Sequence, residues 1–216
     1  MLLSKEIYIS APEEAPRGFC GSPRSNSSIM LNWQAPPEDT WNGDLLWYRI
    51  KYRLKGYISP FLERNTSAWP TTSFELTGLI VFTEYEIKIA AFNNKGVGVY
   101  SDSMFIRTRE GIPGAPPTKV NITSVNSTAI KIIWLPPDAS KINGVNLGYR
   151  ILAKGPGNIQ EEKTIPPDPN DPYNYQNAYL YNLHKFTEYT ITVTCYTSQG
   201  QGPASIPLHI KTEEDG

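Results

Sequence analysis

The chain has 216 residues, of which 39% are hydrophobic and 12% aromatic, with 19 prolines and 16 glycines. This composition suits two domains of about 100 residues built from short strands and turns, and it excludes a disordered chain. With 20 basic and 21 acidic residues the net charge is −1, which excludes an overall field that would attract nucleic acid.

The first predicted element is a strand that precedes the first complete domain. Residues 4–12 resemble residues 101–108, which form the expected last strand of a later domain. We therefore expect residues 1–11 to be the last strand of a preceding module. The apolar stretch at the start is too short for the core of a signal peptide.

Residues 12–110 form the first predicted domain, because apolar side chains alternate with polar ones in several short stretches. Alternation of this kind indicates strands that have one buried face. The side chains expected in the core are Ile29, Leu31, Trp33, Tyr48, Ile50, Tyr52, Phe74, Leu76, Tyr85, Ile87, Ile89 and Ala91.

Residues 111–117 contain prolines and glycines and are predicted to be a short, stiff linker. The second predicted domain, residues 116–216, repeats the landmarks of the first at an offset of about 100 residues. Its expected core comprises Ile130, Ile132, Trp134, Tyr149, Ile151, Ala153, Leu180, Tyr189, Ile191, Val193 and Cys195. The second copy is three residues longer between its tryptophan and its tyrosine, and the prolines of residues 165–172 predict a loop there.

The repeated landmarks resemble those of fibronectin type III modules. They are a tryptophan on the second strand, a Leu-x-x-x-Thr-x-Tyr corner and a Gly-x-Gly before the last strand, with Trp33, Tyr85, Trp134 and Tyr189 as the fold signature. The resemblance implies an all-β chain of two tandem seven-stranded fibronectin type III (immunoglobulin-like) β-sandwiches. In such a corner the tyrosine hydroxyl binds the backbone, so this residue supports the fold and not an active site.

A narrower resemblance is to the sidekick cell-adhesion proteins. It is carried by residues 41–46, 84–87, 98–101, 143–149 and 185–189. It implies the extracellular part of a single-pass plasma-membrane protein, with homophilic adhesion at synapses or cell junctions. In that family recognition lies in immunoglobulin modules that are absent here, so the expected partners are other modules of the same receptor. Muscle-type intracellular arrays and other receptors with such modules are the alternatives.

Four Asn-x-Ser/Thr sequons predict N-glycosylation, at Asn26, Asn65, Asn121 and Asn126. Asn26 and Asn126 fall in the turn before the tryptophan strand, and Asn65 falls in another expected loop. Asn121 lies on an expected strand, close to Asn126, which makes it a poorer acceptor.

A basic row follows one strand of the first domain and predicts a face for a sulfated glycan or an acidic partner. Its outward residues are Trp47, Arg49, Lys51, Arg53 and Lys55, with Lys88 on the neighbouring strand. Glu84 and Glu86 can pair with these cations across the sheet. A row of charges is more often a solvated, salt-bridged face than a binding site, so this interpretation is favoured over binding.

The sequence gives no indication of catalysis, of a cofactor or of a metal. His184 and His209 lie in no recognisable catalytic motif, and Gly96-Val97-Gly98 is followed by a strand where a phosphate loop needs a helix. Cys20 and Cys195 are far apart and lack metal-ligand spacing, and Cys195 has the phase of a buried thiol. We therefore expect a protein that binds or spaces.

Overall fold

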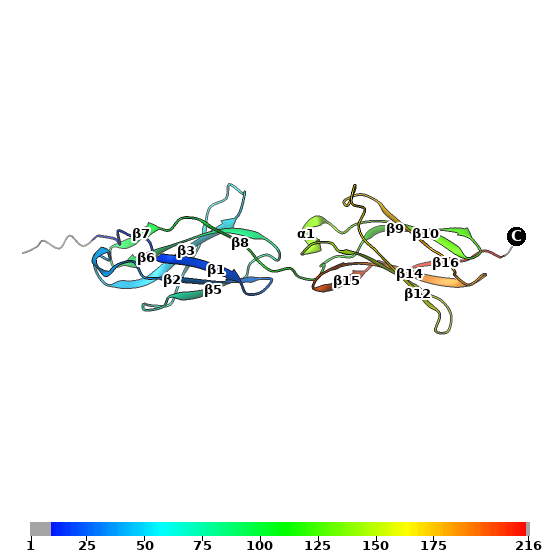
Figure 1. The fold of residues 1–216 in the computed structure, drawn as a ribbon, viewed down its shortest axis with the longest axis horizontal. Coiled ribbons are helices and arrows are strands. Elements are labelled where there is room, and N and C mark those ends of the chain that lie inside the picture. The colour runs from blue at the N-terminus through cyan, green and yellow to red at the C-terminus, as the bar shows by residue number, and fades with distance from the viewer. Residues whose placement is uncertain (1–9, 215–216) are drawn as a thin grey trace, which may run out of the picture. The chain divides into compact units, whose positions relative to one another are not determined.

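A computed structural model describes residues 10–214 of the chain, so most of the strand predicted over residues 1–11 lies outside the described residues. The chain divides into two compact units, the first ending at Arg109 and the second beginning at Glu110. Each unit consists of two layers of strands (Figure 1). No helix within residues 10–214 is long and apolar enough to cross a membrane.

The first unit contains eight strands among its described residues, and a single turn of 3-10 helix at Glu38–Thr40. The strands are β1 (Arg17–Pro23), β2 (Ser28–Gln34), β3 (Leu45–Leu54), β4 (Leu62–Asn65), β5 (Ser73–Thr77), β6 (Glu84–Asn93), β7 (Gly96–Tyr100) and β8 (Met104–Arg107). One sheet has the order β1-β2-β5, and the other has the order β4-β3-β6-β7 with β8 also beside β6. All neighbouring strands are antiparallel.

The second unit repeats this topology. Its strands are β9 (Thr118–Asn126), β10 (Ala129–Leu135), β11 (Gly148–Lys154), β12 (Gln160–Ile165), β13 (Gln176–Leu180), β14 (Glu188–Thr197), β15 (Gly200–Ala204) and β16 (Leu208–Lys211). The short helix α1 (Ala139–Ile142) begins at Asp138, whose side chain accepts a hydrogen bond from the Ser140 amide. The two sheets have the orders β9-β10-β13 and β12-β11-β14-β15, with β16 beside β14. The all-β fold of two sandwiches is thus confirmed.

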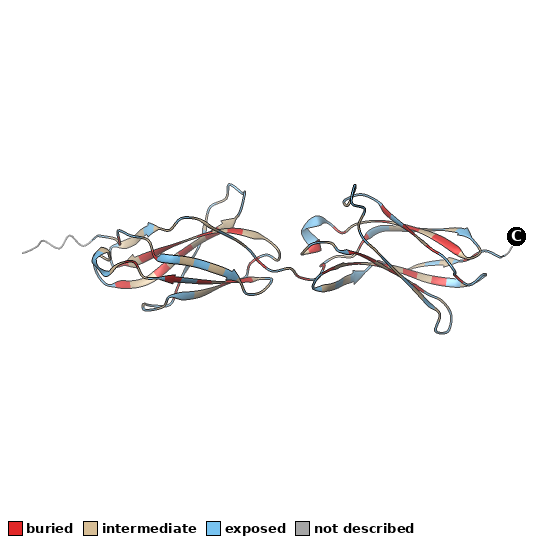
Figure 2. Ribbon diagram, viewed as in Figure 1, coloured by how far each residue is buried: buried red, intermediate tan, exposed pale blue. Residues whose placement is uncertain are grey.

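Each unit has its own core between its two sheets, and the alternating burial along the strands is visible in Figure 2. The predicted core residues are buried, apart from Phe74, which is partly exposed. Trp33 contacts Tyr48 edge to face with ring centroids 5.1 Å apart, and Trp134 contacts Tyr149 in the same way at 5.2 Å. Burial of each such side chain contributes about 1.5 to 3 kcal/mol.

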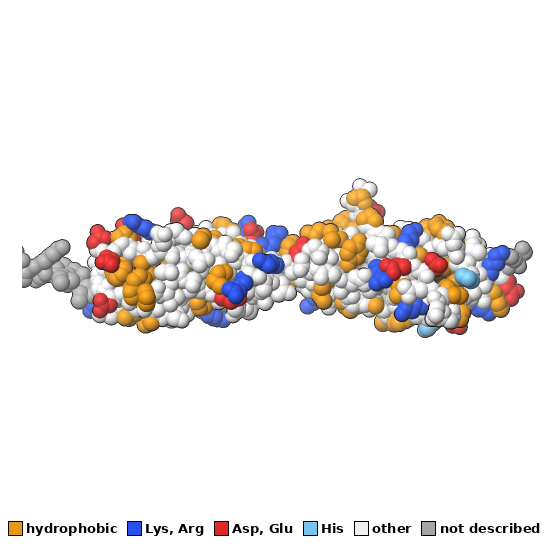
Figure 3. Space-filling view, turned by 60° about the horizontal axis from the view of Figure 1, so that its bottom comes forward, with side chains coloured by type: hydrophobic (Ala, Val, Ile, Leu, Met, Phe, Trp, Pro, Cys, Tyr) orange, Lys and Arg blue, Asp and Glu red, His pale blue; other side chains and the backbone are white. Residues whose placement is uncertain are grey.

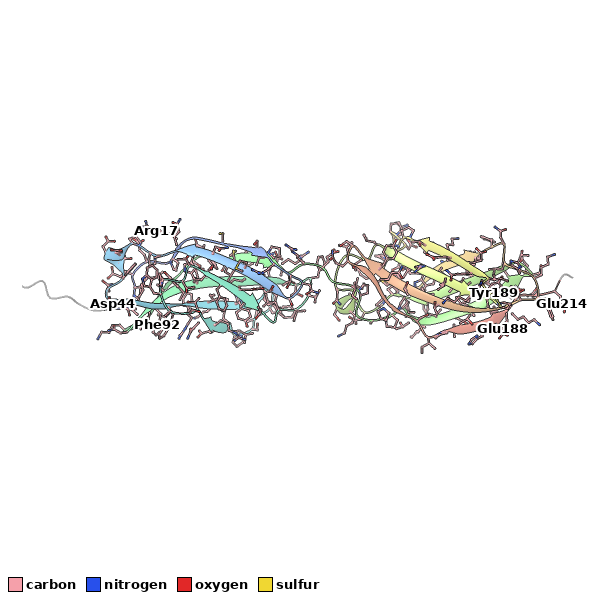
Figure 4. The ribbon with its side chains drawn as sticks, turned by 90° about the horizontal axis from the view of Figure 1, so that it is seen from below. Arg17, Asp44, Phe92, Glu188, Tyr189 and Glu214 are labelled. Carbon is pink, nitrogen blue, oxygen red and sulfur yellow. The ribbon has the colours of Figure 1, made fainter. Side chains whose placement is uncertain are left out.

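Both predicted tyrosine corners are present. The Tyr85 hydroxyl accepts a hydrogen bond from the Ile80 amide at 2.8 Å, and the Tyr189 hydroxyl accepts one from the His184 amide at 2.9 Å. Figure 4 shows Tyr189 beside Glu188, where β14 begins. The corners therefore satisfy backbone donors where the chain passes between the sheets.

The last strand of each sandwich is divided in two, which the sequence pattern did not predict. A serine stands at each division, and its hydroxyl accepts a hydrogen bond from β6 or β14. The Ser101 hydroxyl accepts from the Ile89 amide at 3.1 Å, and the Ser205 hydroxyl accepts from the Val193 amide at 3.0 Å. The side chain thus replaces a ladder hydrogen bond that the irregularity interrupts.

The long loop predicted near residues 165–172 is present as residues 166–175, between β12 and β13. Asn65 and Ser73 of the first unit correspond in register to Thr164 and Asn177 of the second. The segment between them is five residues longer in the second unit, while the hairpin between β11 and β12 is two residues shorter than its counterpart. The net difference of three residues therefore combines an insertion and a deletion.

Candidate functional site

The basic row predicted on β3 lies on the outer side of the five-stranded sheet of the first unit. Trp47, Arg49, Lys51 and Arg53 alternate with the buried side chains of β3, and Lys55 follows the strand. Across the ladder to β6, their partners are Phe92, Ala90, Lys88 and Glu86. We call this surface the cation-aromatic face, and it comprises these residues together with Phe61, Glu63, Asn65, Glu84, Tyr100, Phe105 and Arg107.

Each cation of the β3 row lies over an aromatic ring from another part of the first unit. The distances to the ring centroids are 5.2 Å for Arg49 over Phe92, 4.2 Å for Lys51 over Tyr100, 4.2 Å for Arg53 over Phe61 and 5.1 Å for Lys55 over Phe105. Trp47 stacks on Phe92 with centroids 4.5 Å apart. The sequence pattern identified the cations but missed their aromatic partners, which are brought in by strand register.

Glutamates pair with the same cations, as the sequence predicted for Glu84 and Glu86. Arg53 Nε lies 2.7 Å from Glu86, and Lys55 Nζ lies 2.9 Å from Glu84. The pKa of Glu86 is lowered by the hydrogen bond from the Ser103 hydroxyl and by the bond from Arg53. Such partly exposed pairs each contribute about 0 to 1 kcal/mol.

Positive charge remains in excess on this face. Arg49 and Lys51 share a single carboxylate, Glu63, with N to O distances of 3.6 Å in both pairs. Lys88 stands opposite Lys51 in the ladder and makes no ion pair within residues 10–214. On the face of the molecule that Figure 3 shows, basic and acidic side chains are interspersed on both units. The whole chain has a net charge of −1, so the excess on the cation-aromatic face is local.

The cation-aromatic face is covered by its own side chains. Ala90 points outward from β6 yet is fully buried, because Arg49 and Tyr100 flank it on the adjacent strands. Trp47 Nε1 and the Tyr100 hydroxyl are also buried, and neither has a hydrogen-bond partner in the described part of the chain. Buried polar atoms are normally paired, so these two atoms require an explanation.

All four predicted sequon asparagines are exposed. Asn26 lies in the turn between β1 and β2, Asn126 ends β9, and Asn121 lies within β9 as expected. Asn65 was expected in a loop, but it is the last residue of the edge strand β4. Every residue of β4 is exposed, so no apolar alternation marked it as a strand. Asn65 stands opposite Arg49, whose Nε donates to Asn65 Oδ1 at 3.1 Å.

A second repeated feature fixes the segment that leads into each unit. In the first unit, Asn93 Nδ2 donates to the carbonyl of Ser10 at 2.7 Å, and the Val99 amide donates to that of Pro12 at 3.3 Å. This segment enters at the end of the unit where Figure 4 shows Asp44 and Phe92. A Cβ on Gly98 would come within 2.5 Å of the Pro12 carbonyl oxygen, so the glycine leaves room for the segment.

The corresponding segment of the second unit, residues 110–114, is held in the same way. Thr197 Oγ1 donates to the carbonyl of Gly111 at 2.8 Å, and the Gly111 and Gly114 amides donate to the carbonyls of Asn143 and Lys141. A Cβ on Gly202 would come within 2.6 Å of the Pro113 side chain. Most of the segment predicted as a linker is therefore attached to the second unit by hydrogen bonds.

Glu110 and Arg109, which are consecutive, bond to different units. The Glu110 carboxylate accepts hydrogen bonds from the Val145 amide, at 3.0 Å, and from the Ser198 hydroxyl. These bonds, the one from Ser198 first, lower the pKa of Glu110. The Arg109 amide donates to the Ser25 carbonyl at 3.1 Å, and its own carbonyl accepts from the Phe82 amide.

The remaining groups with reactive side chains are the cysteines and the histidines. Cys195 is buried, which raises the pKa of its thiol to about 11, and its sulfur lies 3.3 Å from Asn146 Oδ1. Cys20 is exposed on the edge strand β1. His209 Nδ1 lies 3.1 Å from the Thr190 hydroxyl. Residues 10–214 contain no cluster of three His, Cys, Asp or Glu side chains suited to a metal ion.

Comparison with known proteins identifies relatives that match more than nine tenths of the chain. The family model for the fibronectin type III domain matches residues 14–107 and 115–211. The chain is 42% identical over 219 residues to Protein sidekick of Drosophila melanogaster, covering 97% of this chain and 10% of that protein. It is 40% identical over 204 residues to Protein sidekick-1 of Homo sapiens, covering 94% and 9%. It is 39% identical over 211 residues to Protein sidekick-2 of Gallus gallus, covering 96% and 10%.

The chain thus spans about a tenth of the length of these relatives. Among solved structures, a similar one is that of the FN1–FN3 domains of chicken CNTN1, with a TM-score of 0.47 and 22% identity. It covers 95% of this chain and 68% of that one.

Proposed function

The chain belongs to the fibronectin type III family, and we propose that it is a non-catalytic spacer in the extracellular part of a sidekick-like, single-pass plasma-membrane adhesion receptor. The two domains, residues 12–110 and 116–216, would connect other modules of the receptor. Homophilic adhesion would be the property of the parent protein, exerted through immunoglobulin modules outside this chain.

The observation that carries the spacer proposal is the connection between Arg109 and Glu110. Arg109 is held by backbone hydrogen bonds of the first domain, and Glu110 is held by its carboxylate in the second. The backbone of residues 111–114 is also restricted, because proline fixes φ and because Gly111 and Gly114 form hydrogen bonds within the second domain. Few backbone torsions are therefore free between the domains, whereas a flexible linker would decouple them.

Insertion of Gly-Ser-Gly-Ser between Arg109 and Glu110 is expected to broaden the distribution of interdomain angles, because the insert adds unconstrained torsions. Small-angle scattering and residual dipolar couplings measure this distribution. The matched control is the same insertion in the loop of residues 166–175, which should leave the distribution unchanged. A native chain whose angles are already as broad as those of the first variant would contradict the spacer proposal.

A second candidate function is the binding of an acidic glycan or protein by the cation-aromatic face, favoured by its excess positive charge. Bacterially produced chain, which lacks N-glycans, should then be retained on heparin at physiological salt. Combined replacement of Arg49, Lys51 and Arg53 by glutamine should abolish retention, because each removed cation weakens the attraction. Replacing Lys119, Lys141 and Lys154 by glutamine changes the net charge equally and serves as the control. Passage of the native chain at this salt would exclude this candidate.

A further inference from the structure

We propose that Asn65 carries an N-linked glycan whose first sugars lie on the cation-aromatic face of its own domain. This inference rests on the proposed extracellular location, since N-glycans are added in the secretory pathway. It assigns a modification to one of four sequons and an occupant to one particular surface. The occupant is covalently attached, so its local concentration at that surface is high.

The modification itself requires an accessible asparagine and the hydroxyl residue of its sequon. Asn65 and Ser67 are both exposed, and β4 is an edge strand. In the transfer step, Asn65 Nδ2 bonds to the anomeric carbon of a polyprenyl-diphosphate-linked oligosaccharide. The bond from that carbon to the diphosphate oxygen breaks, its electron pair leaves with the diphosphate, and Nδ2 loses one proton.

The position of Asn65 directs the glycan over the face. Its side chain lies on the outer side of β4, where Oδ1 accepts the hydrogen bond from Arg49 Nε at 3.1 Å. Neighbouring strands lie about 4.8 Å apart, so β3 and then β6 are within reach of the first two sugars. The row that extends from Asn65 across the sheet is Arg49, Ala90 and Tyr100.

The residues beside this row combine aromatic rings with hydrogen-bond donors, and a sugar can contact both kinds of group. Arg49 and Lys51 cover the rings of Phe92 and Tyr100, and movement of these two side chains would open apolar ring faces to the carbon-bound hydrogens of a sugar. Arg49, Lys51 and Lys88 offer donors to its hydroxyl and acetamide oxygens. A sugar that displaced the Lys51 chain from the Tyr100 ring would also bring an acceptor to the Tyr100 hydroxyl, which lacks a partner in the described chain.

Neither Asn26 nor the corresponding sheet of the second domain has these features. Asn26 lies in a turn at the end of the three-stranded sheet of its domain, away from the cation-aromatic face. In the second domain, Thr164 occupies the place of Asn65, opposite Arg150. Arg150 forms a bidentate ion pair with Glu162. Leu152 occupies the position that corresponds to Lys51 of the first domain. On the five-stranded sheet, the sequon and the receiving surface therefore occur together only in the first of the two described domains. The second domain has a different combination on its three-stranded sheet, where Asn121 lies on the same face as Lys131 and Tyr179.

The test uses the full chain secreted from cultured vertebrate cells. Mass spectrometry of its glycopeptides should show Asn65 occupied, and peptide N-glycosidase should release the Asn65 glycan from the native protein about tenfold more slowly than the Asn26 glycan, which corresponds to about 1.4 kcal/mol of docking. Release at Asn65 should accelerate towards the Asn26 rate in an Arg49→Ala, Lys51→Ala variant. In NMR spectra, the acetamide methyl of the first sugar should show a ring-current shift that this variant loses.

Ser67→Ala is the matched control, because it removes the glycan and keeps the Asn65 side chain beside Arg49. In this variant the signals of Trp47 and Tyr100 should match those of the bacterial chain. The docking proposal is overturned if Asn65 is unoccupied while Asn26 is occupied, or if both glycans are released equally fast and show no ring-current shift. If no sequon is occupied in the secreted chain, the proposed extracellular function itself loses its support.

Discussion

Replacement of Gly202 by alanine is expected to destabilise the second domain by about 1 to 3 kcal/mol, the usual cost of overpacking. The new Cβ would lie 2.6 Å from the Pro113 side chain and 2.8 Å from its carbonyl oxygen. Residues 110–114 would have to move, and the hydrogen bonds of Gly111 and Gly114 would weaken. Chemical denaturation measures the stability, and amide hydrogen exchange at Gly111 and Gly114 reports on the segment.

The comparison variants for this prediction are Gly98→Ala and Gly96→Ala in the first domain. At Gly98 the Cβ would lie 2.5 Å from the Pro12 carbonyl oxygen, so the Val99 amide, which donates to that oxygen, should exchange faster. Gly96 has open space around it but a φ of +136°, so its alanine variant should lose stability through backbone strain alone. Unchanged exchange at Gly111 and Gly114 in Gly202→Ala would refute the anchoring role.

Trp134 is fully buried in the core of the second domain. Trp134→Ala should cost about 3 to 5 kcal/mol through lost burial and the cavity left behind. This is comparable with the total stability of many domains, about 5 to 15 kcal/mol. The second domain should therefore unfold at a much lower temperature, or remain unfolded, while the first keeps its own transition.

Scanning calorimetry distinguishes the two transitions, and Trp33→Ala provides the reciprocal control in the first domain. The two cores share no residue, so each substitution should move only its own transition. A single transition that shifts by the same amount in both variants would show that the two domains unfold as one cooperative unit.

The cores could be predicted from the sequence because their signal is local. From Tyr48 to Tyr52 in β3, and along β14, the buried side chains recur at every second residue, and a strand that buries one face requires this spacing. The tyrosine corners were predictable for a similar reason, since Tyr85 and the Ile80 amide that it binds are five residues apart. Patterns that span only a few residues can be recognised in the sequence without knowledge of the fold.

The cation-aromatic face was predictable only in part, because half of it depends on strand register. The spacing of Arg49 and Lys51 placed both on one side of a strand. Their rings come from Phe92 and Tyr100, on strands far along the chain. The strand β4, which brings Asn65 to this face, has no buried residue and left no pattern to recognise.

The anchored segments could not be predicted, because the residues that hold them lie far from them in the sequence. Asn-Gly and Gly-x-Gly recur in both copies, but the bond from Asn93 joins residues 83 positions apart. Only the folded chain shows that Gly98 and Gly202 leave room for the residues that enter each domain. A glycine repeated without a turn to explain it could have indicated a close approach of backbone.

The consecutive anchoring of Arg109 and Glu110 also determines how the pair responds to tension. A pull along the chain meets no slack between these residues, so the load passes directly from the backbone bonds of one sandwich to the side-chain bonds of the next. The bonds of Glu110 and Gly111 would then bear force before any strand of the second sandwich does. Breaking these hydrogen bonds would lengthen the connection between the two sandwiches without breaking a strand pairing.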